Sequence, residues 1–190
     1  MLEKIPHALG EALSGLRAGI ETTAYHAKFE GAPEAIRVTS PAFGEGAAMP
    51  PRFTQDGERL SPPLAWNGIP AGTAALVLLV EDADSPTPKP IVHAIAWDLE
   101  PTSDGLAEGA LASPGSDGTI GEVGKNTFLK AGYLPPDPPT GHGPHRYLFQ
   151  VYALNRRLGL EGTPGRGALL EAMHGHVLAK GALTATYERP

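Results

Sequence analysis

The residues of this chain that could do chemistry gather around two short segments. Asp82 and Asp84 end an apolar run of strand length, and His145 and Tyr147 begin another. A carboxylate that accepts a hydrogen bond from an imidazole sets the tautomer of that ring and raises its basicity. Imidazoles and a tyrosine hydroxyl can bind a phosphate or carboxylate through hydrogen bonds worth roughly 1.5–3 kcal/mol each. With His93, these residues predict a small anion site whose affinity rises as the pH falls.

The same residue types could also hold a metal ion. Two Asp and two His suit Zn²⁺ or Mn²⁺, so a metal-dependent hydrolase is the alternative to a binding protein. The chain has neither a His-Glu-x-x-His motif nor the Gly-x-Ser-x-Gly motif of serine hydrolases. His174 and His176 stand two residues apart on a predicted helix, which points them in different directions. These patterns argue against a metal-dependent hydrolase and against a serine hydrolase.

Short apolar runs separated by Gly and Pro must position these residues. The 24 Gly and 20 Pro, without a repeat, favour an all-β fold of short strands joined by turns. The run 74–81 is continuously apolar, which is typical of a strand buried on both faces. On a period of two, His93 shares one strand face with Ile95 and Trp97. The predicted strands span residues 36–40, 64–66, 74–81, 91–99, 147–154 and 183–187, and a turn is predicted at 116–118.

Apolar residues at steps of three and four predict an amphipathic helix over residues 2–22. Its apolar stripe would pack on its own domain or on a second copy of the chain, so a homodimer is expected. Residues 23–36 read as a linker. The chain is therefore divided into an N-terminal extension, 1–35, and a domain, 36–190.

A second helix is predicted near the C-terminus, over residues 168–178. Gly181 is expected to end it before the last strand. Between the two site residues His145 and Tyr147, Arg146 is expected to face away and pair with an acidic residue. His142 is interpreted as a loop residue.

Composition bounds the partners and the compartment. At 190 residues the chain suits one domain with a sizeable core. A net charge of −6 argues against nucleic acid as the main partner. The absence of cysteine excludes disulfides and thiolate metal sites. No run approaches the roughly 18 apolar residues of a membrane span. The N-terminal residues include Glu3 and Glu11 and lack a compact hydrophobic region with a cleavage site, so they do not resemble a signal peptide. A cytoplasmic protein without membrane insertion is expected.

Five motifs in order resemble the phosphatidylethanolamine-binding protein family, in its bacterial Raf kinase inhibitor-like (YbhB/YbcL-type) branch. The resemblance runs from about Arg37 to Arg189. The motifs are Phe53-Thr54-Gln55-Asp56-Gly57, Ser61-Pro62-Pro63-Leu64-Ala65-Trp66, Asp82-Ala83-Asp84-Ser85-Pro86, His93 and Gly143-Pro144-His145-Arg146-Tyr147. Ala83 and Ser85 depart from the Pro and Ala that the family usually has there.

The resemblance implies a β-sandwich of two antiparallel sheets with Greek-key connections. It also implies a non-catalytic pocket, without metal or cofactor, for a small phosphorylated anion or phospholipid headgroup, and a protein partner such as a kinase is possible. The residues that correspond to this pocket are Asp82, His93, His145 and Tyr147, with Asp84, Pro86 and Pro139 lining it and Trp97 as a further candidate.

Overall fold

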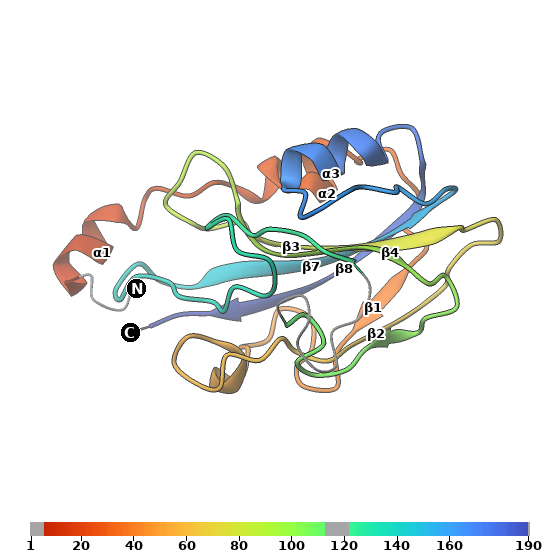
Figure 1. Cartoon of the computed structure of the whole chain (residues 1–190). Coiled ribbons are helices and arrows are strands. Elements are labelled where there is room, and N and C mark those ends of the chain that lie inside the picture. Colours follow the sequence, from red (N-terminus) through yellow and green to blue (C-terminus); the bar gives the residue numbers. More distant parts are fainter. Residues whose placement is uncertain (1–5, 113–121, 190) are drawn as a thin grey trace.

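The chain folds into two antiparallel β-sheets that pack face to face (Figure 1). The computed structural model describes residues 6–112 and 122–189. The larger sheet has the strand order β6-β4-β3-β7-β8 and the smaller sheet the order β1-β2-β5. All pairings among these strands are antiparallel, so the predicted all-β sandwich is confirmed. The strands are β1 (Arg37–Thr39), β2 (Leu64–Asn67), β3 (Ala75–Asp82), β4 (Ile91–Leu99), β5 (Gly105–Leu106), β6 (Glu122–Val123), β7 (His145–Leu154) and β8 (Val177–Tyr187).

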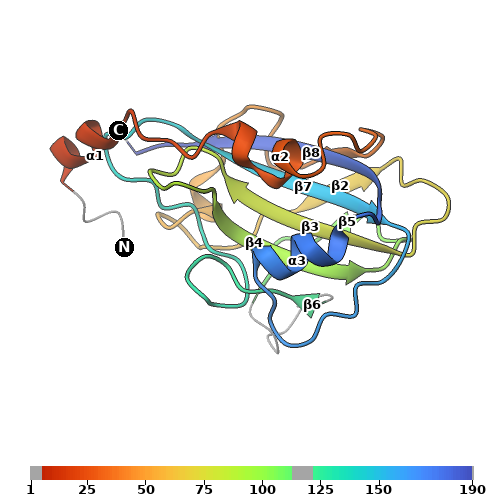
Figure 2. The same cartoon turned by 90° about the horizontal axis from the view of Figure 1, so that it is seen from above.

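Helices cover the face of the larger sheet that the smaller sheet leaves open. α2 (Ala24–Ala27) and α3 (Arg166–Met173) lie over this face in both views (Figures 1 and 2). α1 (His7–Leu13) lies beyond one end of the sheet, near the C-terminus of the chain (Figure 2). Two short 3₁₀ helices span Ile20–Thr22 and Pro51–Phe53. No described helix is long and apolar enough to cross a membrane.

β3 is the central strand, and all of its residues are buried. Leu76, Leu78 and Val80 pack in the core between the two sheets. Val77 and Leu79 point the other way, into the core beneath the helices. Burying each such side chain contributes about 1.5–3 kcal/mol. The prediction of a strand buried on both faces is therefore confirmed, and it explains why the run contains no polar alternation.

The N-terminal helix is much shorter than predicted. Of the predicted span 2–22, α1 occupies only His7–Leu13, and residues 1–5 lie outside the described part of the chain. The chain leaves the helix because its backbone bonds to the loop after β3. The N–H groups of Ala18 and Gly19 donate to the oxygens of Ser85 and Ala83 at 2.9 and 2.8 Å.

Part of the predicted linker, 23–36, belongs to the core. Its residues 24–27 form α2, where the N–H of Ala24 donates to the carboxylate of Glu81 at 2.7 Å. The ring of Phe29 packs edge-on against Tyr152, with the ring centroids 5.1 Å apart. This part of the N-terminal extension is therefore held on the helix-covered face of the larger sheet.

The C-terminal helix also ends earlier than predicted. α3 ends at Met173, and β8 begins at Val177, inside the span 168–178. Gly181 lies in the middle of β8, so the prediction that it ends the helix is wrong. A β-carbon at Gly181 would collide with the backbone oxygen of Ile36, so this glycine allows a close approach of two chain segments. The turn predicted at 116–118 lies outside the described residues.

Candidate anion site

One end of the larger sheet carries most of the residues predicted to bind an anion. Asp82, at the end of β3, is opposite Tyr147 in β7. The Pro-rich loop after residue 132 crosses this end, and the N–H of Leu134 donates to the oxygen of His93 at 2.7 Å. A cavity of about 620 Å³ lies here. Its walls include four of the predicted residues, Asp82, Pro86, His93 and His145.

A β-bulge in β4 brings His93 to this cavity. Val80 pairs with Ala94, whereas the next residue, Glu81, pairs with Val92, so His93 is an extra residue in the strand. A bulge bends its strand and changes the direction of the side chain that it inserts. The orientation of His93 is therefore set by the bulge and not by simple alternation along the strand.

Trp97 lies on the other face of the sheet from His93. Trp97 and Ile95 belong to the core beneath the helices. The ring of His93 instead packs against Tyr147, 5.1 Å between centroids, and Tyr147 belongs to the core between the sheets. The predicted shared face of His93, Ile95 and Trp97 is therefore wrong. Neither Trp97 nor Tyr147 lines the cavity, although Tyr147 packs against His93. At the loop, Pro138 lines the cavity and Pro139 does not.

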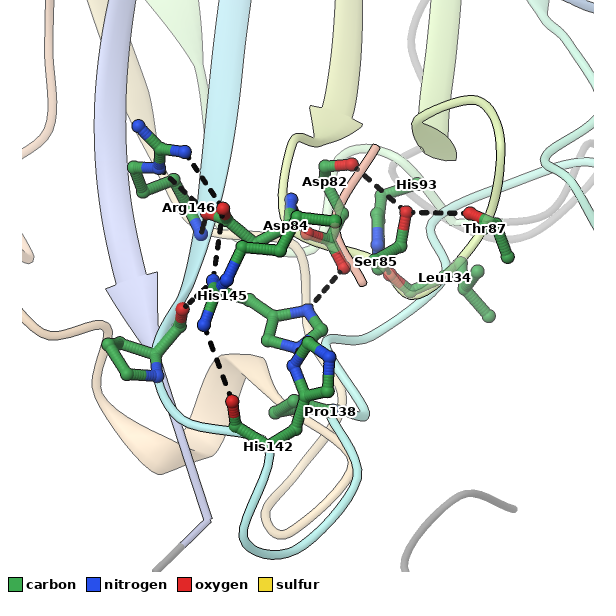
Figure 3. Close-up of polar contacts among 12 residues, drawn as sticks. Asp82, Asp84, Ser85, Thr87, His93, Leu134, Pro138, His142, His145 and Arg146 are labelled. Atoms are coloured by element: carbon green, nitrogen blue, oxygen red, sulfur yellow. Dashed lines mark hydrogen bonds and ion pairs between the residues drawn. The ribbon is translucent and has the colours of Figure 1, made fainter. Parts of the chain in front are cut away.

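Asp82 and His145 form a buried pair at the cavity wall (Figure 3). Oδ2 of Asp82 lies 2.8 Å from Nδ1 of His145, and the two residues are 4% and 1% exposed. The second oxygen, Oδ1, accepts the backbone N–H of Asp84 at 2.8 Å. The ring of His145 also stacks on Tyr147, with centroids 6.3 Å apart. Both oxygens of Asp82 are thus used, and its direction is set from two sides.

His93 presents a nitrogen without a partner. Its Nδ1 lies 2.7 Å from the oxygen of Leu134, which can only accept, so Nδ1 carries the proton. Nε2 is buried and has no hydrogen-bond partner among the described residues. Burial lowers the pKa of His93, although the charge of Asp82 acts in the opposite direction. The neutral ring therefore offers Nε2 as an acceptor.

The hydroxyl of Tyr147 is the second buried polar group of this kind. Tyr147 is 1% exposed, and its hydroxyl has no hydrogen-bond partner within the described ranges. Burial, together with the charge of Asp82, raises the pKa of Tyr147 well above its ordinary value. The hydroxyl therefore stays protonated and can donate. A buried polar atom that lacks a partner is costly, so two of them side by side point to a ligand or ordered water.

Asp84 does not line the cavity and instead holds Arg146 (Figure 3) and Arg17. Nε and Nη2 of Arg146 donate to its carboxylate at 2.7 and 2.8 Å, and Nη1 of Arg17 lies 3.0 Å away. Burial acts to raise the pKa of Asp84, but the hydrogen bonds from Arg146 and Arg17 outweigh it and lower the pKa to about 2. The prediction that Arg146 faces away and pairs with an acid is confirmed.

His142 is a buried partner of the site that the sequence did not reveal. It is 1% exposed, and its Nδ1 lies 2.8 Å from Nε2 of His145. Its own Nε2 lies 2.9 Å from the backbone oxygen of Leu13 (Figure 3 shows the ring beside His145). The spacing of two His three residues apart was visible in the sequence. The contact with Leu13 was not, because it joins residues that are 129 positions apart.

The described residues offer little to a metal ion. Within residues 6–112 and 122–189, no group of three or more His, Asp or Glu side chains is placed to hold one. Nδ1 of His93 and both ring nitrogens of His145 are already engaged in hydrogen bonds. What remains open is one acceptor nitrogen and one hydroxyl, which suit a small ligand that both donates and accepts hydrogen bonds.

Known proteins match most of the chain in sequence. The family model for phosphatidylethanolamine-binding protein matches residues 39–188. A UPF0098 protein of Methanothermobacter thermautotrophicus is 40% identical over 149 residues, covering 78% of this chain and 95% of the relative. A UPF0098 protein of Chlamydia trachomatis is 37% identical over 158 residues, covering 81% of this chain and 99% of the relative.

Solved structures match the same fold. A phosphatidylethanolamine-binding protein homolog from Chlamydia trachomatis has a TM-score of 0.73 at 36% identity, over 83% of this chain and 99% of its own. E. coli YbcL, described as a member of the mammalian PEBP family, has a TM-score of 0.75 at 26% identity, over 82% and 99%. The family match, the relatives and the arrangement of the two sheets agree, and the chain belongs to the phosphatidylethanolamine-binding protein family.

Proposed function

We propose that this protein is a non-catalytic binder of small phosphorylated anions, which include free phosphate esters and the headgroups of phospholipids. The observation that carries the proposal is a pair of buried polar atoms without partners among the described residues, Nε2 of His93, which lines the cavity, and the hydroxyl of Tyr147, whose ring packs against His93. A phosphate group offers both kinds of partner at once. Its oxygens accept from the tyrosine hydroxyl, and a protonated phosphate oxygen donates to Nε2 of His93.

Among the described residues, four Asp, Arg and Lys side chains line the cavity, and the two acidic ones, Asp82 and Asp137, are paired with His145 and Arg189. Arg59 and Lys130 line the cavity, and both are exposed. Long cationic side chains at a rim attract anions from solution and raise the rate of association. A cavity of about 620 Å³ has room for a phosphate with a short organic substituent.

Binding should take up a proton. Because burial lowers the pKa of His93, the ring is neutral in the empty protein at neutral pH. A bound anion favours the charged ring, or it brings the proton itself as a monoprotonated phosphate. In either case the affinity rises as the pH falls, by up to about tenfold per pH unit for one proton. The increase ends once the empty protein itself becomes protonated.

Titration calorimetry tests the proposal with phosphate, phosphoethanolamine and Zn²⁺ at about pH 6 and about pH 8. We expect one anion to bind per chain, more tightly at the lower pH. Tyr147→Phe removes one hydrogen bond to the anion and should weaken binding by about 10- to 100-fold. Tyr152→Phe removes a hydroxyl that bonds Gln150 away from the cavity and is the matched control.

The outcomes separate the proposed function from its alternative. Equal phosphate affinity in the wild type and in Tyr147→Phe would contradict the proposed site. Zn²⁺-dependent hydrolysis of a phosphate ester would instead support the metal-dependent hydrolase. A kinase partner stays a prediction from the family resemblance, and a homodimer stays a prediction from the N-terminal pattern.

A further inference from the structure

His142 connects the N-terminal segment (residues 7–19) with the buried pair at the cavity. Its Nε2 lies 2.9 Å from the oxygen of Leu13 and 3.2 Å from the oxygen of Leu16. Its Nδ1 lies 2.8 Å from Nε2 of His145, whose Nδ1 lies 2.8 Å from Asp82. We call His142, His145 and Asp82 the polar row. The row begins at the backbone of the N-terminal segment and ends at the cavity wall.

The polar row needs three protons to form its hydrogen bonds. A backbone oxygen cannot donate, so Nε2 of His142 carries a proton. A second proton lies between the two rings, and a third lies between His145 and Asp82. Two neutral imidazoles bring only two protons. Two neutral rings and the Asp82 carboxylate together carry a charge of −1. The fully bonded row holds one proton more, so its net charge is zero.

Without the N-terminal segment the row would need only two protons. His142 could then take the other tautomer and donate from Nδ1 to His145, while its Nε2 accepted from water. His145 would donate to Asp82 and remain neutral. The row would then carry the negative charge of the Asp82 carboxylate at the wall of the cavity. The oxygens of Leu13 and Leu16 exclude this state, because they would face the lone pair of Nε2.

The environment of His142 disfavours a second proton on that ring. Burial lowers the pKa of His142, and the charges of His145 and Arg17 lower it further. Most of the other charged groups nearby are engaged: Arg17 pairs with Asp84, and Arg189 with Asp56 and Asp137. The titratable and charged groups around the row come from every element packed against it. They are His7 and Arg17 from the N-terminal segment, Asp84 after β3, His93 in β4, Arg146 and Tyr147 in β7, Asp137 in the Pro-rich loop and Arg189 after β8.

The N-terminal segment is fitted closely to the loop that carries His142. A β-carbon at Gly10, in the middle of α1, would collide with the backbone oxygen of Thr140. Nη1 of Arg17 donates to the oxygen of Pro144 at 2.9 Å, and its Nη2 donates to that of His142 at 3.3 Å. By contrast, a β-carbon at Gly15 would meet nothing within 4 Å. An alanine at Gly10 should therefore disturb this contact, and an alanine at Gly15 should not.

We propose that His142 is a positioning residue through which the docked N-terminal segment keeps the polar row in its three-proton state, so that the cavity can accept an anion. The role in anion binding rests on the function proposed above. Docking neutralises the row by one charge, which removes the repulsion between Asp82 and a phosphate. Linkage makes the effect reciprocal, so a bound anion also stabilises the docked segment.

The protonation state can be measured without any ligand. Nitrogen-15 NMR of the imidazole rings in the full chain reports which ring nitrogens carry protons. At neutral pH we expect a proton on Nε2 of His142 and a proton on Nε2 of His145, because these two atoms donate to Leu13 and to Nδ1 of His142 in the three-proton state. The signals lost in His142→Gln and in His145→Gln identify the two rings. An unprotonated Nε2 on either ring would overturn the three-proton state.

Phosphate titrations test the consequence for binding. His142→Leu keeps an apolar side chain of similar size but cannot bond His145, and we expect phosphate affinity to fall about tenfold with a changed pH profile. His142→Gln should restore affinity, because its amide oxygen and nitrogen are one carbon apart, as the two ring nitrogens are. Gly10→Ala should also weaken binding by displacing α1, whereas Gly15→Ala should not.

The outcomes of these titrations are distinguishable. Unchanged phosphate affinity in both His142→Leu and Gly10→Ala would overturn the role of His142 and leave the proposed function intact. Failure of the wild type to bind phosphate would overturn the proposed function and, with it, the role of His142 in anion binding. The NMR proton count would then still decide whether the three-proton state exists.

Discussion

At the scale of single residues, the two acidic groups after β3 have different tasks. Asp82 orients His145 at the cavity wall, whereas Asp84 ties Arg146 and Arg17 together outside the cavity. They stand two positions apart, yet only Asp82 lines the cavity. Asp84 is 1% exposed, and an ion pair of this kind is costly to break because the remaining charges lose their partner.

Asp84 should make the free energy of unfolding depend on pH in the acid range. Its pKa is lowered from 3.8 to about 2, so the folded state gains stability above the unfolded pKa and loses it as the pH falls through about 2. The shift corresponds to roughly 2 kcal/mol. Asp84→Asn should lower the free energy of unfolding by about this much at neutral pH. The free energy of unfolding of this variant should also change less with pH in the acid range. Urea unfolding over this pH range measures it, with exposed Asp104→Asn as the control; the same pH dependence in Asp84→Asn and wild type would contradict it.

At the scale of elements, small local features decide where strands and helices lie. The bulge at His93 directs that ring into the cavity, and Gly181 lets β8 pass close to the backbone of Ile36. Neither feature adds a favourable contact of its own. Both adjust the geometry of long apolar strands so that the site and the second sheet can form.

Two glycines, one in a crowded position and one in open space, test this role of local geometry. Gly181→Ala places a methyl group against the backbone of Ile36, and such overpacking costs about 1–3 kcal/mol. Gly167→Ala, on the exposed side of α3 where a β-carbon meets nothing, should gain up to about 1 kcal/mol. Thermal or urea unfolding of both variants measures whether each substitution lowers or raises stability. Unchanged stability in Gly181→Ala would show that β8 and the backbone of Ile36 are not in close contact.

At the scale of the whole molecule, the N-terminal extension is part of the domain surface and reaches the site. α2 is held by Glu81 on the helix-covered face, and α1 reaches the loop that carries His142. The outer side of this segment leaves Leu9 and Leu16 exposed, at 49% and 56%. Two exposed leucines on one short segment keep the expectation of a contact between two copies of the chain.

A homodimer through this segment would be lost when its leucines become charged. We expect the wild type to sediment with twice the mass of one chain and the double variant Leu9→Glu, Leu16→Glu to sediment as a monomer. Analytical ultracentrifugation over a range of protein concentrations measures both. Phe128→Glu changes a residue that is 50% exposed on another loop and is the control. A dimer that survives the double variant would remove these leucines from the contact.

The sequence by itself determined the strand-forming runs, the burial of β3 on both faces and the polar residues at the ends of the strands. Each of these follows from local pattern, because apolar runs and the polar residues at their ends are read along a few consecutive positions. Only the tertiary structure decided that Trp97 lies on the other face, that Gly181 lies within a strand and that His142 is buried. These depend on a bulge and on contacts between segments distant in the chain, and no local period records which distant backbone will lie against a side chain.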